Sequence, residues 1–146
     1  AVGGAEGLSC EGAIVLGADT VVVAPDGETF GKPIDAADAT RMLGCLSGRQ
    51  HRGLTGFALL DGASLRPLTQ EVVETVVFFR DLTAKEIERY VAGGESMGKA
   101  GAYAIQGRAA GFVTRVEGSY TNVVGLPLAE VEVALRSAID SNMLSG

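Results

Sequence analysis

The chain has 146 residues, of which 47% are hydrophobic, and this is enough for one globular domain with a sizeable core. Its net charge of −6 excludes the broad basic surface that binds nucleic acid polymers, so we expect a small-molecule partner instead. No apolar stretch approaches the roughly 20 residues that cross a bilayer, and the first residues do not resemble a signal peptide, so we expect a soluble cytoplasmic protein without a membrane partner.

The cysteines and the single histidine limit the metal chemistry. Cys10 and Cys45 lack the spacing of a zinc site, and we interpret both as reduced thiols. One histidine excludes a His-based metal cluster, and we interpret His51 as a hydrogen-bonded residue in a loop. Because no change in composition marks a boundary, we expect a single domain over residues 1–146.

The first half of the chain predicts a buried strand followed by a helix. Residues 13–23 form a nearly continuous apolar run, which indicates a strand covered on both faces, with Asp19 as the one charge inside it. Asp35 is typical of a helix N-cap, and Gly48 indicates where that helix ends. The apolar residues of this helix recur with helical spacing at Ala39, Met42, Leu43 and Leu46.

The second half predicts a hairpin, a helix, a strand and a last helix. Residues 55–60 and 71–79 are rich in β-branched and aromatic side chains and indicate two paired strands. Thr83 begins a capping-box pattern, residues 112–117 indicate a short strand, and Pro127 begins a closing helix. The apolar face of the closing helix is expected at Leu128, Val131, Leu135 and Ile139. The fold class is therefore α/β, and the hairpins favour a mixed rather than a purely parallel sheet.

Asp19 and Lys32 form the first candidate site, because a carboxylate in a strand and a lysine across a short turn suit a phosphate–metal site. The aspartate can hold a divalent cation or accept a proton from water, and the lysine can neutralise phosphate charge. Each also has a structural interpretation: Asp19 as a carboxylate bonded to nearby backbone, and Lys32 as a solvated turn residue.

A basic loop and a glycine-rich segment supply the other candidates. Arg49 follows a helix end and can reach a phosphate or cap that helix. In the segment 98–107, Lys99 offers positive charge and Gln106 offers an amide that can donate and accept at a base edge. A glutamine satisfied by backbone is the structural alternative, and the segment is not a Walker sequence.

Four segments together resemble the Maf family of nucleoside triphosphate pyrophosphatases. In chain order they are Gly17–Val23 with Gly31-Lys32-Pro33, Leu46–His51, Gly98–Gly107 and Glu117–Leu128. The resemblance implies an elongated mixed α/β fold, shared with inosine triphosphatases, with a cleft between two lobes. It also implies cleavage of a nucleoside triphosphate to the monophosphate and pyrophosphate with a divalent cation, Mg²⁺ or Mn²⁺.

The resemblance assigns roles to individual residues. Asp19 matches the catalytic proton acceptor of the family, and Lys32 matches the lysine at the triphosphate. Thr20 and Gln106 match the threonine and glutamine of members that act on dTTP and UTP. We accordingly expect Asp19 and Lys32 to be catalytic, Asp19 to hold the metal, and Thr20, Arg49, Lys99 and Gln106 to bind the substrate.

The sequence departs from the family pattern at its start. Maf proteins open with a Ser-x-Ser-Pro-Arg-Arg segment whose arginines contact the nucleotide, and this segment is not found here. We expect an N-terminally incomplete Maf-like domain in which residues 1–5 are the tail of a helix. The alternative to an enzyme is a catalytically weak or inactive nucleotide-binding module. A missing strand would expose a sheet edge, which a homodimer would mask.

Overall fold

The computed structural model describes residues 13–145, and within this range it contains one sheet and four α-helices. The strands are β1 (Ile14–Val23), β2 (Thr29–Phe30), β3 (Gln50–Asp61), β4 (Pro67–Phe79) and β5 (Val113–Glu117). The helices are α1 (Ala36–Leu46), α2 (Ala84–Ala92), α3 (Tyr120–Val124) and α4 (Leu128–Ser145). Two 3-10 turns cover Ala100–Ala102 and Arg108–Phe112. The predictions for residues 1–5 and for Cys10 concern positions outside the described residues.

The strands form one sheet in the order β2-β1-β3-β4-β5, which confirms the α/β class. Every pair is antiparallel, so the parallel pairing that a mixed sheet also contains is not seen among residues 13–145. The predicted hairpin is confirmed as β3 and β4, which pair along almost their whole length. Strand β2 pairs with β1 only at Val22 and Val23, so within the described residues the rest of β1 is a sheet edge.

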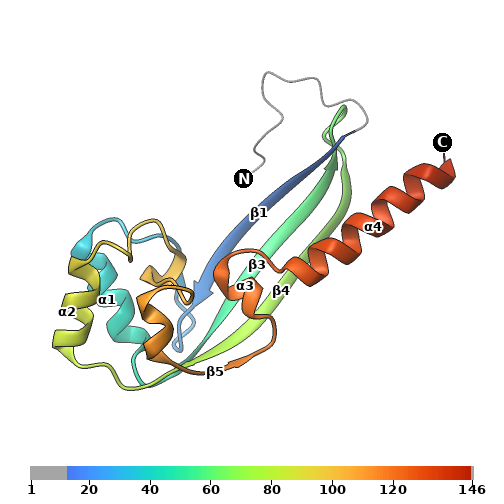
Figure 1. Cartoon of the computed structure of the whole chain (residues 1–146). Helices are drawn as coiled ribbons and strands as arrows, with labels where there is room; N and C mark the ends of the chain where they lie inside the picture. The colour runs from blue at the N-terminus through green and yellow to red at the C-terminus, as the bar shows by residue number, and fades with distance from the viewer. Residues whose placement is uncertain (1–12, 146) are drawn as a thin grey trace.

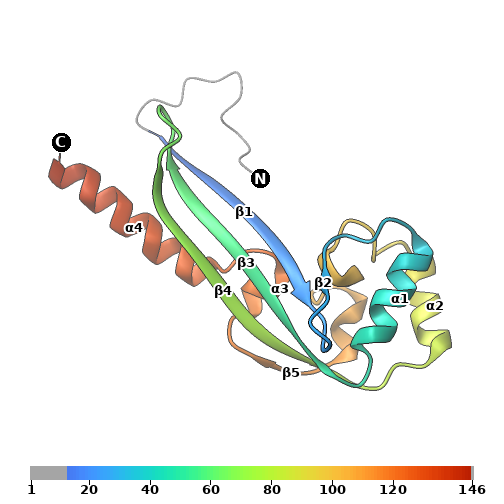
Figure 2. The same cartoon turned by 180° about the vertical axis from the view of Figure 1, so that it is seen from behind.

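The molecule is elongated, because the long hairpin extends far beyond the helices α1 and α2 that gather at one end of the sheet (Figure 1). The view from behind shows α4 lying along the sheet on the opposite side from the viewer (Figure 2). The larger core lies at the helical end, where α1, α2 and the 3-10 turns pack against the ends of the strands. A smaller core joins the hairpin to α4 and contains Phe57, Leu59, Val131, Ala134 and Ala138.

Local capping explains why α1 and α2 begin where the sequence predicts. The Asp35 carboxylate accepts the backbone N–H of Asp38 at 2.7 Å, and this satisfies a free donor of the first turn of α1. Thr83 and Glu86 form the complete capping box of α2. The four apolar residues predicted for the first helix are all buried in the core.

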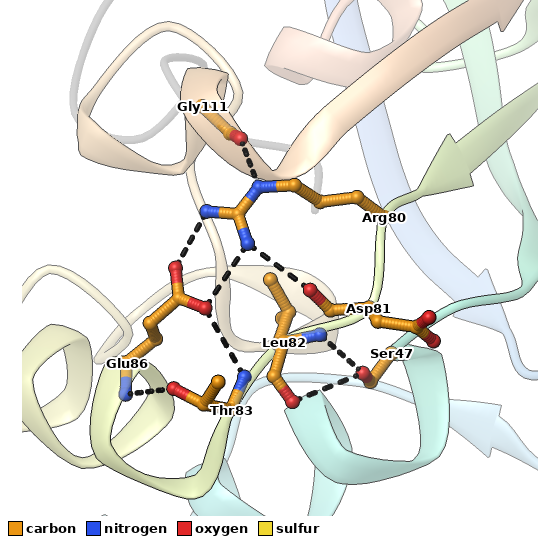
Figure 3. Close-up of polar contacts among 7 residues, drawn as sticks. All are labelled: Ser47, Arg80, Asp81, Leu82, Thr83, Glu86 and Gly111. Atoms are coloured by element: carbon orange, nitrogen blue, oxygen red, sulfur yellow. Dashed lines mark hydrogen bonds and ion pairs between the residues drawn. The ribbon is translucent and has the colours of Figure 1, made fainter.

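An ion-pair network fixes the junction between α1, β4 and α2 (Figure 3). The Arg80 guanidinium binds the Glu86 carboxylate through two hydrogen bonds of 2.6 and 3.1 Å, and its Nε donates to the Gly111 carbonyl at 2.8 Å. Nearby, the Ser47 hydroxyl accepts the Leu82 backbone N–H at 2.7 Å. The Arg80 hydrogen bond is the largest cause that lowers the pKa of Glu86 from its usual 4.5 to about 2.

Two burial predictions were wrong. Strand β1 is not covered on both faces, because Leu16 and Asp19 are exposed among the described residues. In α4 the expected residue Val131 is buried, but Leu128 and Ile139 are 55% and 42% exposed. The small residues Ala134 and Ala138 face the sheet instead, because they let the helix approach the large Phe57 and Leu59 side chains closely.

Within residues 13–145, no helix combines the length and the apolar character that crossing a bilayer requires.

Candidate functional site

A cleft of about 290 Å³ lies where β1 meets the helical end of the molecule. Its walls come from β1, from the turn after β2, from the glycine-rich segment and from the end of α3. The cleft brings together five of the six predicted site residues, namely Asp19, Thr20, Lys32, Lys99 and Gln106. These positions are far apart in the sequence, so the fold and not local proximity assembles the site.

Close packing against β1 places the two lysines on the same cleft. Gly101 has φ of +72°, and a Cβ at this position would lie 2.7 Å from the Val22 side chain, so only glycine fits without a shift. The Gly101 backbone N–H also donates to the Gly31 carbonyl at 3.1 Å. Because Lys32 and Lys99 lie within two residues of these glycines, the contact brings both lysines to one cleft.

The loop that carries Gln106 is fixed on both sides by a carboxylate and a phenol. The Tyr90 hydroxyl accepts the Ala104 backbone N–H at 3.0 Å and donates to Glu95 at 2.7 Å. Glu95 in turn accepts the Arg108 backbone N–H at 2.9 Å. The hydrogen bond from Tyr90 is the largest cause that lowers the pKa of Glu95, so this carboxylate stays ionised.

A buried asparagine anchors helix α3 beside the cleft. Asn122 is 1% exposed, and its amide nitrogen donates to the Gly53 carbonyl, the Val73 carbonyl and the Thr75 hydroxyl at 2.9 to 3.2 Å. These bonds attach α3 to β3 and β4, and they bring Gly125 at the end of α3 next to Thr20. Asn122 belongs to a segment that carries the Maf resemblance, yet its role depends on contacts that the sequence does not reveal.

Asp19 borders the cleft from the exposed edge of the sheet. Alternate residues of a strand face opposite sides, so Asp19 and Thr20 point to different faces of β1. Asp19 accordingly also borders a shallow groove on the other face, with Gly17, Gly56 and Val72. The carboxylate is exposed, and a ligand can therefore reach it without any rearrangement of the strand.

The structure does not bring Arg49 to this cleft. Arg49 lines a separate hollow with Arg41 and Cys45, and its carbonyl accepts the Phe79 backbone N–H at 3.0 Å. Gly53, the β3 residue at the cleft, lies four residues further along, or about 13 Å in an extended chain. A contact between Arg49 and a nucleotide in the cleft is therefore not supported. Cys45 is half-buried and carries a free thiol.

His51 was expected in a loop, but it is a core residue of β3. The ring is 2% exposed, and its Nε2 lies 2.6 Å from the Tyr103 hydroxyl oxygen. Burial lowers the pKa of His51 from 6.5 to about 4, so the ring is neutral at pH 7. Tyr103 borders the cleft, which makes His51 a support for one wall of the site and not a ligand-binding residue.

The carboxylate that borders the cleft suits a divalent cation that is also bound to the phosphates of a ligand. No group of three or more His, Cys, Asp or Glu residues that could hold a metal occurs within residues 13–145. Asp19 is the one carboxylate that borders the cleft among these residues. Because Mg²⁺ is commonly held by one or two carboxylates together with substrate phosphates, a single carboxylate suffices when a polyphosphate supplies the other ligands.

The protein is of the α/β class, and its cleft combines two lysines with one exposed carboxylate. Residues 4–138 match the family model described as Maf-like protein, and the chain belongs to this family. It is 56% identical over 126 residues to a dTTP/UTP pyrophosphatase of Citrifermentans bemidjiense. The aligned residues make up 86% of this chain and 64% of the relative. It is also 58% identical over 127 residues to a dTTP/UTP pyrophosphatase of Geobacter metallireducens, with 87% and 65% covered.

A dTTP/UTP pyrophosphatase of Pelotomaculum thermopropionicum is 53% identical over 126 residues, which cover 86% of this chain and 65% of the relative. The chain thus spans slightly less than two thirds of the length of these relatives.

Proposed function

We propose that the protein is a nucleoside triphosphate pyrophosphatase that cleaves UTP and dTTP to the nucleoside monophosphate and pyrophosphate. The observation that carries this proposal is the cleft itself, which places Asp19 with Lys32, Lys99, Thr20 and Gln106. The relatives named dTTP/UTP pyrophosphatase support the choice of substrate. The partner is therefore a small-molecule nucleotide and not a nucleic acid polymer.

The proposed reaction is an in-line attack of water on the α-phosphorus. The water oxygen forms a bond to this phosphorus, one water proton passes to the Asp19 carboxylate, and the bond from the α-phosphorus to the bridging oxygen breaks. Pyrophosphate leaves with that bridging oxygen and its electron pair. Lys32 and Lys99 neutralise the charge that grows on the departing phosphates, because both border the same cleft.

A divalent cation, Mg²⁺ or Mn²⁺, supplies further neutralisation of the triphosphate when it is bound, and Asp19 is the residue that would hold it. Asp19 has two carboxylate oxygens, so it would be able both to hold the cation and to accept the proton.

The Asp19→Asn variant tests this assignment. An amide cannot accept the proton and carries no charge, so we expect pyrophosphate release from UTP to fall by about 10²–10⁴-fold. Initial rates with saturating UTP and Mg²⁺ measure the effect. The matched control is Asp140→Asn on the exposed surface of α4, which we expect to retain the full rate. If the Asp19 variant turned over UTP as fast as the control, Asp19 would not be the catalytic base.

A further inference from the structure

The glycine-rich segment is attached to the rest of the fold at two separate places. Its first half, which carries Lys99, is attached through Gly101 to β1 and to the turn after β2. Its second half, which carries Gln106, is attached to α2 and to the residues that follow this helix. Lys99 and Gln106 border the same cleft, so different contacts support its cation and its amide.

Gln106 lies in a tight turn whose two ends are both held by side chains. At one end, the Ala104 backbone N–H donates to the Tyr90 hydroxyl at 3.0 Å. At the other end, the Arg108 backbone N–H donates to the Glu95 carboxylate at 2.9 Å. The Tyr90 hydroxyl donates to the same Glu95 oxygen at 2.7 Å, and this bond joins the two supports.

Burial and close packing make the turn depend on these two side chains. Ala104 is 6% exposed, so without the Tyr90 hydroxyl its N–H would be left unpaired unless the turn moved. A Cβ at Gly107 would lie 2.5 Å from a Glu95 oxygen, so only glycine lets the carboxylate lie against the turn. The core in turn fixes Tyr90, whose ring centroid lies 5.1 Å from that of Phe112.

We propose that Tyr90 and Glu95 are positioning residues that hold the Gln106 amide at the cleft, so that recognition of the nucleobase, but not of the triphosphate, depends on a hydrogen bond outside the cleft. Neither Tyr90 nor Glu95 is among the described residues that line the cleft. The inference rests on the proposed function, because it takes Gln106 as a residue that contacts the base. Without the Tyr90 hydroxyl, the turn would shift to give the Ala104 N–H a new partner, and the amide would move with it.

The Tyr90→Phe variant tests the inference, because it removes the hydroxyl and keeps the ring in the core. Two probes are measured by calorimetry with Mg²⁺ on the full chain: the α,β-methylene analogue of UTP, which carries the base, and inorganic tripolyphosphate, which does not. We expect the affinity for the UTP analogue to fall about tenfold, the factor that one hydrogen bond contributes, and the affinity for tripolyphosphate to stay the same.

The matched control is Tyr120→Phe, because Tyr120 is 50% exposed, and this variant should change neither affinity. Equal losses for both probes in Tyr90→Phe would overturn the inference, because the hydroxyl would then support the whole site. An unchanged affinity for the UTP analogue would overturn it as well.

A double-mutant cycle tests whether Tyr90 acts through Gln106. Gln106→Ala removes the amide that is positioned. In this background we expect Tyr90→Phe to leave the affinity for the UTP analogue unchanged, because residues that act through one another are not additive. Additive losses in the double variant would overturn the inference.

The Glu95→Gln variant tests the same support from its other side and decides the question if Tyr90→Phe does not fold. The glutamine oxygen still accepts hydrogen bonds, but a neutral acceptor makes bonds about half as strong as a charged one. We therefore expect an affinity loss of about threefold for the UTP analogue and none for tripolyphosphate. Full affinity for the UTP analogue, or equal losses for both probes, would overturn the inference.

The failure of this inference differs from the failure of the proposed function. A loss limited to the UTP analogue in Tyr90→Phe, with no cleavage of UTP by the unmodified chain, would remove the catalytic proposal and leave the positioning roles standing. Cleavage of UTP with equal losses for both probes would do the reverse. Absence of binding of the UTP analogue to the unmodified chain would overturn the inference, because the base would not be recognised in the cleft.

Discussion

At the scale of single residues, His51 links the burial of one ring to the pH dependence of folding. The ring is buried against Phe79 and Tyr103, and its pKa falls to about 4. Its unfolded pKa is about 6.5, so between these values the unfolded state binds more protons than the folded state. Titration of His51 therefore lowers the free energy of unfolding as the pH falls from 6.5 to 4.

We predict that the free energy of unfolding falls over this pH range and that the His51→Gln variant falls less. The neutral amide keeps a hydrogen-bonding group near Tyr103 but does not titrate in this range. The difference between the two proteins, measured by urea unfolding at pH 7 and pH 4, should change by about 3 kcal/mol. Parallel pH profiles for the two proteins would show that His51 is not the titrating group.

The sequence identified the polar residues of the cleft better than the residues that support them. Asp19, Lys32, Lys99 and Gln106 carry charge or an amide in recognisable segments, and the fold brings all four to one cleft. Tyr90 and Glu95 could not be found in this way, because their hydrogen bonds to the turn that carries Gln106 form only when α2 packs beside the glycine-rich segment.

At the scale of elements, the junction between β4 and α2 depends on the Arg80–Glu86 pair. Glu86 is both the acidic member of the capping box and the partner of Arg80 (Figure 3). Its folded pKa of about 2 lies below the ordinary 4.5, so the stabilisation that it provides is complete above pH 4.5. The stabilisation is lost as the pH falls from 4.5 to 2.

We predict that Glu86→Gln lowers the melting temperature at pH 7 and that the gap to the unmodified protein narrows below pH 4.5. Glutamine can still serve in a capping box, but it cannot attract the guanidinium. Glu88→Gln is the matched control, because Glu88 is exposed on the same helix. A melting temperature as high in Glu86→Gln as in Glu88→Gln at pH 7 would refute the role of the pair.

Elements with local signals were predicted well, and features that depend on distant contacts were not. The caps of α1 and α2 are encoded within a few residues, and both helices are confirmed at the predicted positions. The buried face of α4 was misjudged at Leu128 and Ile139, because the sheet surface under the helix decides which side chains it accepts. The exposure of Asp19 likewise depends on which elements cover β1.

At the scale of the whole molecule, the site lies where two packing units meet. The hairpin with α4 forms one unit and the helical end forms the other (Figure 1). The residues that line the cleft come from β1 and from segments of the helical end. This arrangement agrees with the elongated fold that the resemblance implied. Because residues of both units border the cleft, the geometry of the site depends on the contact between β1 and Gly101.

We propose that this cleft directs water to the α-phosphorus of a pyrimidine nucleoside triphosphate. The most direct measurement is incubation of the 146-residue chain with UTP and Mg²⁺ in ¹⁸O-labelled water, followed by mass spectrometry of the products. We expect UMP and pyrophosphate, with the label in the phosphate of UMP. Uncleaved UTP, formation of UDP and phosphate, or label in pyrophosphate would contradict it.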